Sequence, residues 1–92
     1  MEKRVGIIGI VVEESSCAEQ VNAVLHDYAE LIVGRMGIPY RQRGISVISL
    51  IVDGSTDEIS ALTGRLGRVR GVSVKSMVAK SAGKPEGKDS NV

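Results

Sequence analysis

The chain has few aromatic, cysteine or histidine residues. Among its 92 residues it has no tryptophan, no phenylalanine, two tyrosines, one cysteine and one histidine. A lone cysteine can neither close an internal disulfide nor supply a thiolate metal cluster. The formal net charge of +1 gives no general electrostatic reason to bind nucleic acid or an anionic membrane. We therefore expect an aliphatic core and no chemistry that depends on these residue types.

Long apolar runs are also absent. No segment reaches the roughly 18 apolar residues of a membrane-spanning helix, and the charged residues 1–4 lead directly into a predicted strand. We expect a cytoplasmic protein without membrane contact. The length suits one domain, which we place at residues 1–79. Residues 80–92, rich in lysine, glycine and serine, are expected to form a disordered tail.

Two short segments, 5–12 and 45–52, carry apolar side chains on both faces when they are read as strands. A strand of this kind has neighbouring strands on both sides and is covered above and below. The segments 31–40 and 72–79 instead contain glycine, proline, serine and charged residues, which edge strands tolerate. The sequence therefore predicts two central strands and two edge strands.

A first helix is predicted between the strands at 5–12 and 31–40. It begins at Ser15 or Ser16, whose hydroxyl groups suit an N-cap, and glycine ends it near 31–34. Its apolar residues recur at spacings of three and four, which forms one buried stripe. The stripe consists of Cys17, Val21, Val24, Leu25, Tyr28, Leu31 and Ile32.

A second helix is predicted to begin with a capping box formed by Ser55 and Glu58 and to stop before Gly71. Its core stripe is Ile59, Leu62, Leu66 and Val69. The resulting order βαββαβ is the split βαβ arrangement of the ferredoxin-like fold, in the α+β class. In this fold an antiparallel four-stranded sheet carries both helices on one face.

The other face of that sheet has no helix to cover it. Half of the apolar side chains in the two central strands would lie there, and an exposed aliphatic patch of this kind usually marks an interface. We therefore expect a homo-oligomer, either a dimer or a tetramer.

Few side chains are suited to catalysis. His26 is predicted on the polar helix face beside Glu30, which favours a solvated, paired imidazole over a metal ligand. Cys17 lies on the apolar stripe, which favours a buried thiol over a nucleophile or redox sensor. Glu13 and Glu14 are adjacent at a strand end and point to opposite faces, so they form no general acid–base pair. We expect no enzyme, no metal site and no cofactor.

Two patterns in the sequence are candidates for binding. Every charged residue in 13–30 is acidic when His26 is counted as neutral, and every charged residue in 65–80 is basic. This predicts attraction between adjacent helices, with a basic surface for an acidic partner or nucleic acid as the alternative. The second pattern is a strip of small residues, which indicates either close approach by another molecule or tolerated sequence variation. The strip is Ser60, Gly64, Gly67 and Gly71.

The stretch 20–76, together with the first strand RVGIIGIVVE, resembles the small stand-alone ACT-like proteins described as iron-only hydrogenase system regulators. The segment ISALTGRLGRVRGVSVK is also similar to ACT domains and to the C-terminal domain of nickel-responsive repressors. The resemblance implies a ferredoxin-like fold, an oligomer and a regulatory role. It does not extend to nickel binding, because 31–40 and 45–52 contain no histidine or cysteine. The sequence Glu-Glu-Ser-Ser replaces the Pro-Gly turn of ACT domains that sense amino acids, so an amino-acid effector is not implied.

Three functional hypotheses follow. The first is a regulator that binds a small effector near Glu13, Glu14 and Ser15, through carboxylates for a cation and a hydroxyl for a polar group. The second is an adaptor that docks a partner protein without a small ligand. Its surface would be Ser60, Gly64, Gly67, Arg65, Arg68 and Arg70. The third is DNA association through the basic C-terminal half, which would weaken steeply with salt.

Overall fold

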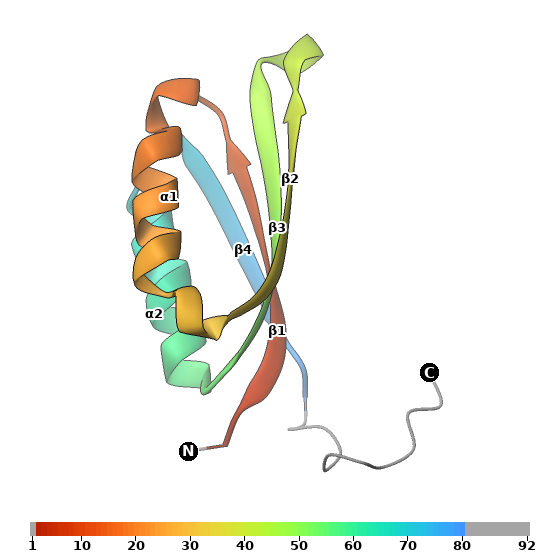
Figure 1. Ribbon diagram of the computed structural model, residues 1–92, viewed down its shortest axis with the longest axis vertical. Helices are drawn as coiled ribbons and strands as arrows, with labels where there is room; N and C mark the ends of the chain where they lie inside the picture. The colour runs from red at the N-terminus through yellow and green to blue at the C-terminus, as the bar shows by residue number, and fades with distance from the viewer. Residues whose placement is uncertain (1, 81–92) are drawn as a thin grey trace, which may run out of the picture.

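Two helices lie on one face of a four-stranded antiparallel sheet in the computed structural model, which describes residues 2–80 (Figure 1). The strands are β1 (Arg4–Val12), β2 (Ile32–Tyr40), β3 (Ile45–Gly54) and β4 (Val72–Val78), and the helices are α1 (Ala18–Asp27) and α2 (Thr56–Gly67). The sheet order is β2-β3-β1-β4. This confirms the predicted ferredoxin-like α+β fold with the first and third strands in the centre. Apart from Lys80, the predicted tail lies outside the described residues.

The core lies between the sheet and the helices. Alternate residues of the two central strands point toward the helices and are buried, because successive strand residues face opposite sides. These are Ile8, Ile10 and Val12 of β1 with Ile48, Leu50 and Val52 of β3. The helices meet them with Val21, Leu25, Ile59, Leu62 and Leu66. The core is entirely aliphatic apart from the thiol of Cys17, as the composition predicts.

The capping box predicted for α2 is confirmed. The Ser55 backbone N–H donates to Glu58 Oε1 at 2.9 Å, and the Glu58 N–H donates to Ser55 Oγ at 3.1 Å. The hydrogen bonds from Ser55 stabilise the carboxylate and hold the pKa of Glu58 below its ordinary value. After α2, Gly71 lies in the turn before β4 and adopts a φ of 78°, a conformation that glycine accepts readily.

The first helix differs from the prediction at both ends. Residues Ser15–Cys17 form a short 3₁₀ turn, and neither this turn nor α1 has a side-chain N-cap. The predicted serine cap is therefore wrong. The helix ends at Asp27, and Ile32 already belongs to β2, where it pairs with Val52. Strand pairing overrides the helical spacing, since β-branched residues fit a half-buried strand well.

A bulge and a tight connection shape the β2–β3 hairpin. Val33 is the extra residue of the bulge, because Ile32 pairs with Val52 while Gly34 pairs with Ile51. A 3₁₀ turn at Arg41–Arg43 and Gly44, at a φ of 67°, join the two strands. The predicted turn at 41–44 is confirmed.

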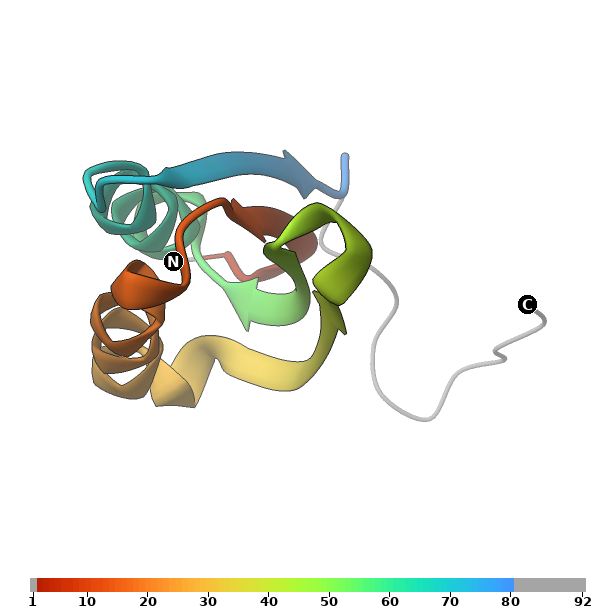
Figure 2. The same cartoon turned by 90° about the horizontal axis from the view of Figure 1, so that it is seen from above.

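The two helices cover the sheet unequally. Viewed from above, both lie on the same side of the sheet, with α2 beside β4 and α1 beside the start of β2 (Figure 2). α2 packs closely against β4, whereas α1 makes few contacts with β2. The inner face of the β2–β3 hairpin therefore remains partly open. Within residues 2–80, no helix is long and apolar enough to cross a bilayer.

Candidate functional site

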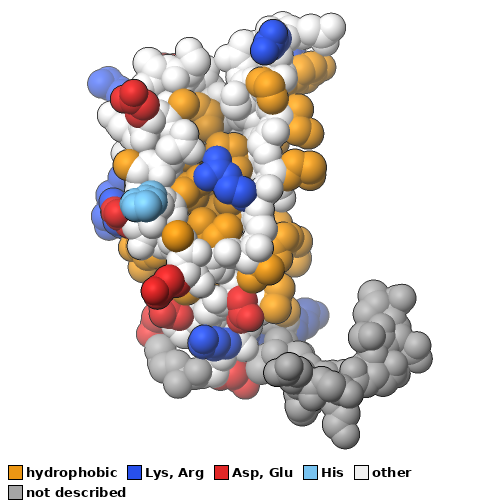
Figure 3. All heavy atoms as spheres, in the orientation of Figure 1, with side chains coloured by type: hydrophobic (Ala, Val, Ile, Leu, Met, Phe, Trp, Pro, Cys, Tyr) orange, Lys and Arg blue, Asp and Glu red, His pale blue; other side chains and the backbone are white. Residues whose placement is uncertain are grey.

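A groove runs between α1 and the inner face of the β2–β3 hairpin. Figure 3 shows hydrophobic side chains on its floor and one basic side chain lying across it. The central pocket has a volume of about 200 Å³. A second pocket of about 290 Å³ shares Val12, Pro39 and Ser46 with the first and extends to the end of the hairpin. We call this continuous space the α1–β2 groove.

The groove exists because β2 presents little side-chain volume to α1. Register pairs Arg35 with Leu50, Gly37 with Ile48 and Pro39 with Ser46, so these β2 residues lie on the helix side of the sheet. All three are nevertheless exposed. A Cβ atom added at Gly37 would lie 3.8 Å from Ile48 Cγ1, an ordinary contact. An edge strand with glycine and proline on its inner face thus leaves room for a ligand.

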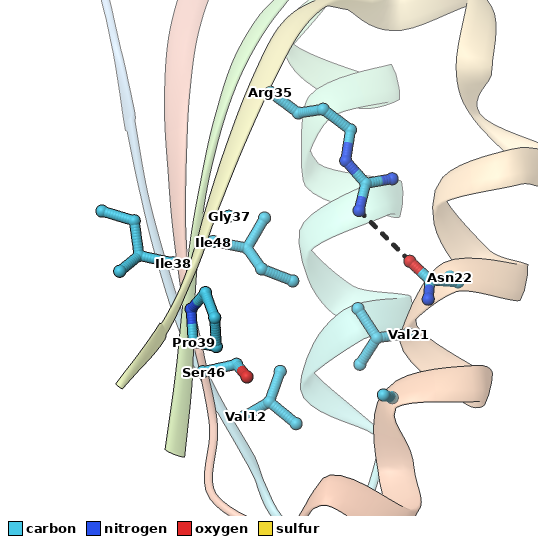
Figure 4. Close-up of a pocket in the computed structure, with 10 residues that line it drawn as sticks. Val12, Val21, Asn22, Arg35, Gly37, Ile38, Pro39, Ser46 and Ile48 are labelled. Atoms are coloured by element: carbon cyan, nitrogen blue, oxygen red, sulfur yellow. Dashed lines mark hydrogen bonds between the residues drawn. The ribbon is translucent and has the colours of Figure 1, made fainter. Parts of the chain in front are cut away.

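Arg35 crosses the groove from β2 to α1. Its Nη2 atom donates to Asn22 Oδ1 at 3.2 Å (Figure 4). On the far side of this contact, a third pocket of about 410 Å³ is lined by Leu25, His26 and Ile32 as well as by Arg35 and Asn22. The guanidinium group therefore sits between two cavities, and its remaining N–H groups are available to an acceptor in either one.

The charge of the groove is positive. Arg35 lies between the central pocket and the third pocket, Arg41 lies at the hairpin end, and none of the residues that line the three pockets is acidic. Arginine binds carboxylates and phosphates through paired hydrogen bonds. The floor between the two arginines is apolar and includes Val12, Val21 and Ile48. This combination suits a small anion that also carries an apolar part.

The structure does not bring the three predicted effector residues into one cavity. Ser15 lines the hairpin end of the groove near Arg41. Glu13 is turned toward β4, where Oε2 accepts from Ser73 Oγ at 2.8 Å. Glu14 lies against the turn at Gly71. No group of three histidine, cysteine or acidic side chains that could hold a metal ion occurs among the described residues.

The small-residue strip is shorter than the sequence predicts. Ser60, Gly64 and Gly67 are exposed on α2, and a Cβ atom added at either glycine would meet nothing within 4 Å. Gly71 lies apart from them, in the turn before β4 and close to Glu14. The partner surface on α2 remains a prediction.

Of the arginines assigned to that surface, Arg65 already has partners within the chain. Its Nη1 atom donates to Asp27 Oδ2 at 3.1 Å, and its guanidinium lies 5.5 Å from the Tyr28 ring centroid. The hydrogen bond to Asp27 raises the pKa of Arg65. This contact joins the acidic and basic helices in the way that the charge pattern predicts. Arg68 and Arg70 are exposed.

The sequence patterns predict the environments of His26 and Cys17 correctly but do not indicate Arg35 and Asn22. His26 is exposed, although no ion pair with Glu30 is recorded among residues 2–80, and Cys17 is 7% exposed. From the sequence, Arg35 is only a charged residue of a predicted edge strand. Its inward position depends on the bulge at Val33, for which the sequence offers no signal.

Comparison with known proteins identifies relatives over nearly the whole described chain. The family model TM1266-like, described as "Iron-only hydrogenase system regulator, putative", matches residues 4–76. The structure of uncharacterized protein TM1266 from Thermotoga maritima is 40% identical, covers 86% of this chain and 100% of its own, and superposes with a TM-score of 0.82. A search of curated proteins finds no match.

More distant structures share the fold alone. The ACT domain from GTP pyrophosphokinase of Chlorobium tepidum is 23% identical over 82% of this chain and 99% of its own, with a TM-score of 0.70. The C-terminal domain of the MgtC protein from Mycobacterium tuberculosis is 12% identical over 91% of this chain and 96% of its own, with a TM-score of 0.64.

Proposed function

Since this chain belongs to the TM1266-like family of iron-only hydrogenase system regulators, we propose that it is a non-enzymatic regulatory module whose effector binds in the α1–β2 groove. The ACT-like fold supports a regulatory role. The effector is a small anion with an apolar part, and its binding state is passed to a partner of the hydrogenase system.

The position of Arg35 carries this proposal. Its guanidinium lies between two pockets with apolar floors and is held by one hydrogen bond to a neutral amide at 3.2 Å. A carboxylate or phosphate forms stronger, charge-assisted hydrogen bonds with arginine than an amide does. An anionic effector would therefore compete effectively with Asn22 for this group.

The same contact offers a route from binding to regulation. Arg35 and Asn22 connect β2 to α1, and other contacts between these two elements are few. An anion that takes over Arg35 would release Asn22 and change how α1 is held against the hairpin. A ligand that favours one of two arrangements shifts their populations in proportion to its differential affinity.

Thermal unfolding in the presence of acetate, butyrate, hexanoate and inorganic phosphate tests the site. We expect the Tm to rise with the apolar length of the carboxylate, because the longer chains bury more surface on the groove floor. R35Q should abolish the rise, whereas the matched control R68Q, an exposed arginine beyond α2, should retain it. An equal response from the two variants would contradict the site.

A further pair of variants separates the groove from the effector site predicted from the sequence. E13Q/E14Q leaves Arg35 in place and should therefore retain the full response to hexanoate. If this variant loses the response while R35Q keeps it, the effector binds at the loop after β1 and not in the groove. Native mass spectrometry of gently purified protein would then identify any effector that remains bound, as an extra mass that the responsible variant lacks.

A second candidate function is an adaptor that docks a partner protein on α2. The observation that favours it is the pair of exposed glycines, Gly64 and Gly67, in a helix where glycine costs about 1 kcal/mol relative to alanine. G64L should abolish partner capture in this case, while the chain remains folded by circular dichroism. Intact capture by G64L would exclude the adaptor surface.

A further inference from the structure

Most of the exposed large hydrophobic side chains of residues 2–80 lie on the face of the sheet opposite the helices. In one row across three strands, Ile51, Ile7 and Met77 lie side by side and are 39%, 41% and 60% exposed. A parallel row contains Ile38, Val47 and Val11. Hydrophobic side chains line the outer side of the sheet in Figure 3. Soluble monomers rarely leave so continuous an apolar surface without a partner.

The row of residues between these two has small side chains at its centre. Ser49 and Gly9 lie opposite each other there, with Lys75 beyond Gly9 on β4. A Cβ atom added at Gly9 would have no neighbour closer than 4.0 Å. The aliphatic rows on either side are therefore separated by a shallow depression, which can receive the side chains of another sheet.

The charges on this face are few and complementary. Within the registered rows, Asp53 and Lys75 are the charged side chains, and both are exposed. They lie on different strands and at different heights of the sheet. At the corner next to β4, the carboxylate of Glu13 is occupied by the hydroxyl group of Ser73. A surface with one free acid and one free base, set apart in this way, is complementary to a copy of itself.

We propose that this face binds the same face of a second copy of the chain, around a two-fold axis that pairs Asp53 of each copy with Lys75 of the other. A two-fold interface requires that residue i contacts residue j while j contacts i. The paired charges satisfy that condition, and the aliphatic rows between them are buried. This inference goes beyond the proposed function, because the groove lies on the other side of the sheet.

The strand register gives the position of the axis. From Ile7, Asp53 lies one strand toward β3 and two residues along, opposite Val5. Lys75 lies one strand toward β4 and two residues along in the other direction, opposite Gly9. Ile7 is therefore midway between the two charges. An axis that exchanges them passes through Ile7 and places this side chain against its counterpart.

The face is large enough for such a dimer. Strands lie about 4.8 Å apart and rise about 3.3 Å per residue, so four strands of seven to ten residues form a flat footprint of roughly 19 by 23–33 Å. The accessible area of its side chains exceeds this flat footprint. A standard interface buries about 800 Å² on each partner, which is within reach of this face.

Charge reversal tests the pairing. In sedimentation equilibrium, D53K alone and K75D alone should each raise the dimer Kd by about tenfold or more, because like charges then face each other. The double variant D53K/K75D should restore dimerisation, since it exchanges the two charges and again places opposite charges across the interface. Failure of the double variant to recover, with both single variants weakened, would overturn the pairing.

A second set of variants tests the face itself. I7K should leave a folded monomer, because it buries an unpaired charge at the axis only in the dimer. S60K, at an exposed position on α2, is the matched control and should retain the wild-type oligomer. A monomeric wild type would overturn the proposal, and so would a dimer that S60K disrupts and I7K does not. R35Q should dimerise normally, so that loss of effector binding and loss of dimerisation are distinguishable.

Discussion

The chain consists of two strand-helix-strand units that differ in how well each helix covers its second strand. In the second unit α2 starts at a capping box and packs against β4. In the first unit α1 has no side-chain cap, ends at Asp27, and makes few contacts with β2. The topology of the two units is the same. The tighter unit covers its strand, while the looser one leaves the α1–β2 groove open.

This difference arises from a small number of residues. β2 presents Arg35, Gly37 and Pro39 to its helix, whereas β4 presents Val72, Val74 and Val78, which pack against the core. Aliphatic side chains draw a helix onto the sheet by burying apolar area. An arginine, a glycine and a proline provide little apolar area. They leave hydrogen-bond donors and an open cavity between the strand and its helix instead.

The largest expected effect is in the core of the tighter unit. Leu62 is fully buried, and L62A should lower the free energy of unfolding by about 2–5 kcal/mol, as large-to-small core substitutions do. In the looser unit, I32A should cost less, about 1–2 kcal/mol, because Ile32 is only half-buried. Urea denaturation measures both values. Equal losses would show that the first unit is as tightly packed as the second.

Two glycines on the inner face of the sheet provide the next comparison. A Cβ atom at Gly6, opposite Val78 of β4, would lie 2.9 Å from the Met77 carbonyl oxygen. G6A should therefore destabilise the chain by about 1–3 kcal/mol. G37A has room and should leave stability unchanged within about 0.5 kcal/mol, while its methyl group narrows the groove and weakens hexanoate binding. Destabilisation by G37A would mean that the groove is closed in solution.

The N-termini of the two helices also differ, because α2 has a side-chain cap and the first helix has none. S55A removes the side-chain acceptor of α2, which is one of the two hydrogen bonds of the capping box, and should lower the free energy of unfolding by about 1 kcal/mol in urea denaturation. S16A is the matched control, because the structure records no side-chain cap at the start of the first helix. A comparable loss of unfolding free energy in S16A would show that a serine does cap the first helix, as the sequence predicts.

The capping box also predicts a pH dependence. Because the pKa of Glu58 is lower in the folded chain than in the unfolded chain, its stabilising contribution is present above the unfolded pKa. The contribution is lost as the pH falls through the lower, folded pKa. E58Q removes this titration, so the stability of the variant should fall less steeply than that of the wild type in acid. Parallel curves for the two proteins would contradict this assignment.

The smallest effect is expected on the exposed side of α2. G64A should raise the free energy of unfolding by about 0.5–1 kcal/mol, because alanine is the better helix former and a Cβ atom meets nothing within 4 Å. Thermal unfolding measures the gain. A loss of stability would show that another chain approaches Gly64 closely in solution.

Most of the fold could be predicted because local patterns and tertiary packing agree. The two-sided apolar segments 5–12 and 45–52 must be central strands, and the pair Ser55 and Glu58 satisfies the helix start without help from the rest of the chain. The end of the first helix could not be predicted in this way. Leu31 and Ile32 continue its spacing of apolar residues, but pairing between Ile32 and Val52 draws the chain into the sheet.

The groove could not be predicted, because it depends on register and not on residue type. Arg35 reaches α1 only because β2 is bulged, and Asn22 is one of several polar residues on the exposed side of α1. The sequence placed the candidate effector site at Glu13, Glu14 and Ser15, where strand ends and helix starts meet. The structure distributes those side chains between the groove and β4, and the effector contacts of all three remain a prediction.

The bulge at Val33 determines which residues of β2 share a cavity with α1. If Val33 instead paired with Ile51 and formed no bulge, the register would shift by one residue, so Arg35 would lie opposite Ser49 on the outer face and Met36 would turn inward opposite Ile48. Loss of the bulge with Val33 kept in the strand would thus replace the cation of the groove with a thioether and place a charge on the apolar face. One irregularity in β2 therefore determines the chemistry of both faces of the sheet, whereas a substitution changes a single side chain on one face.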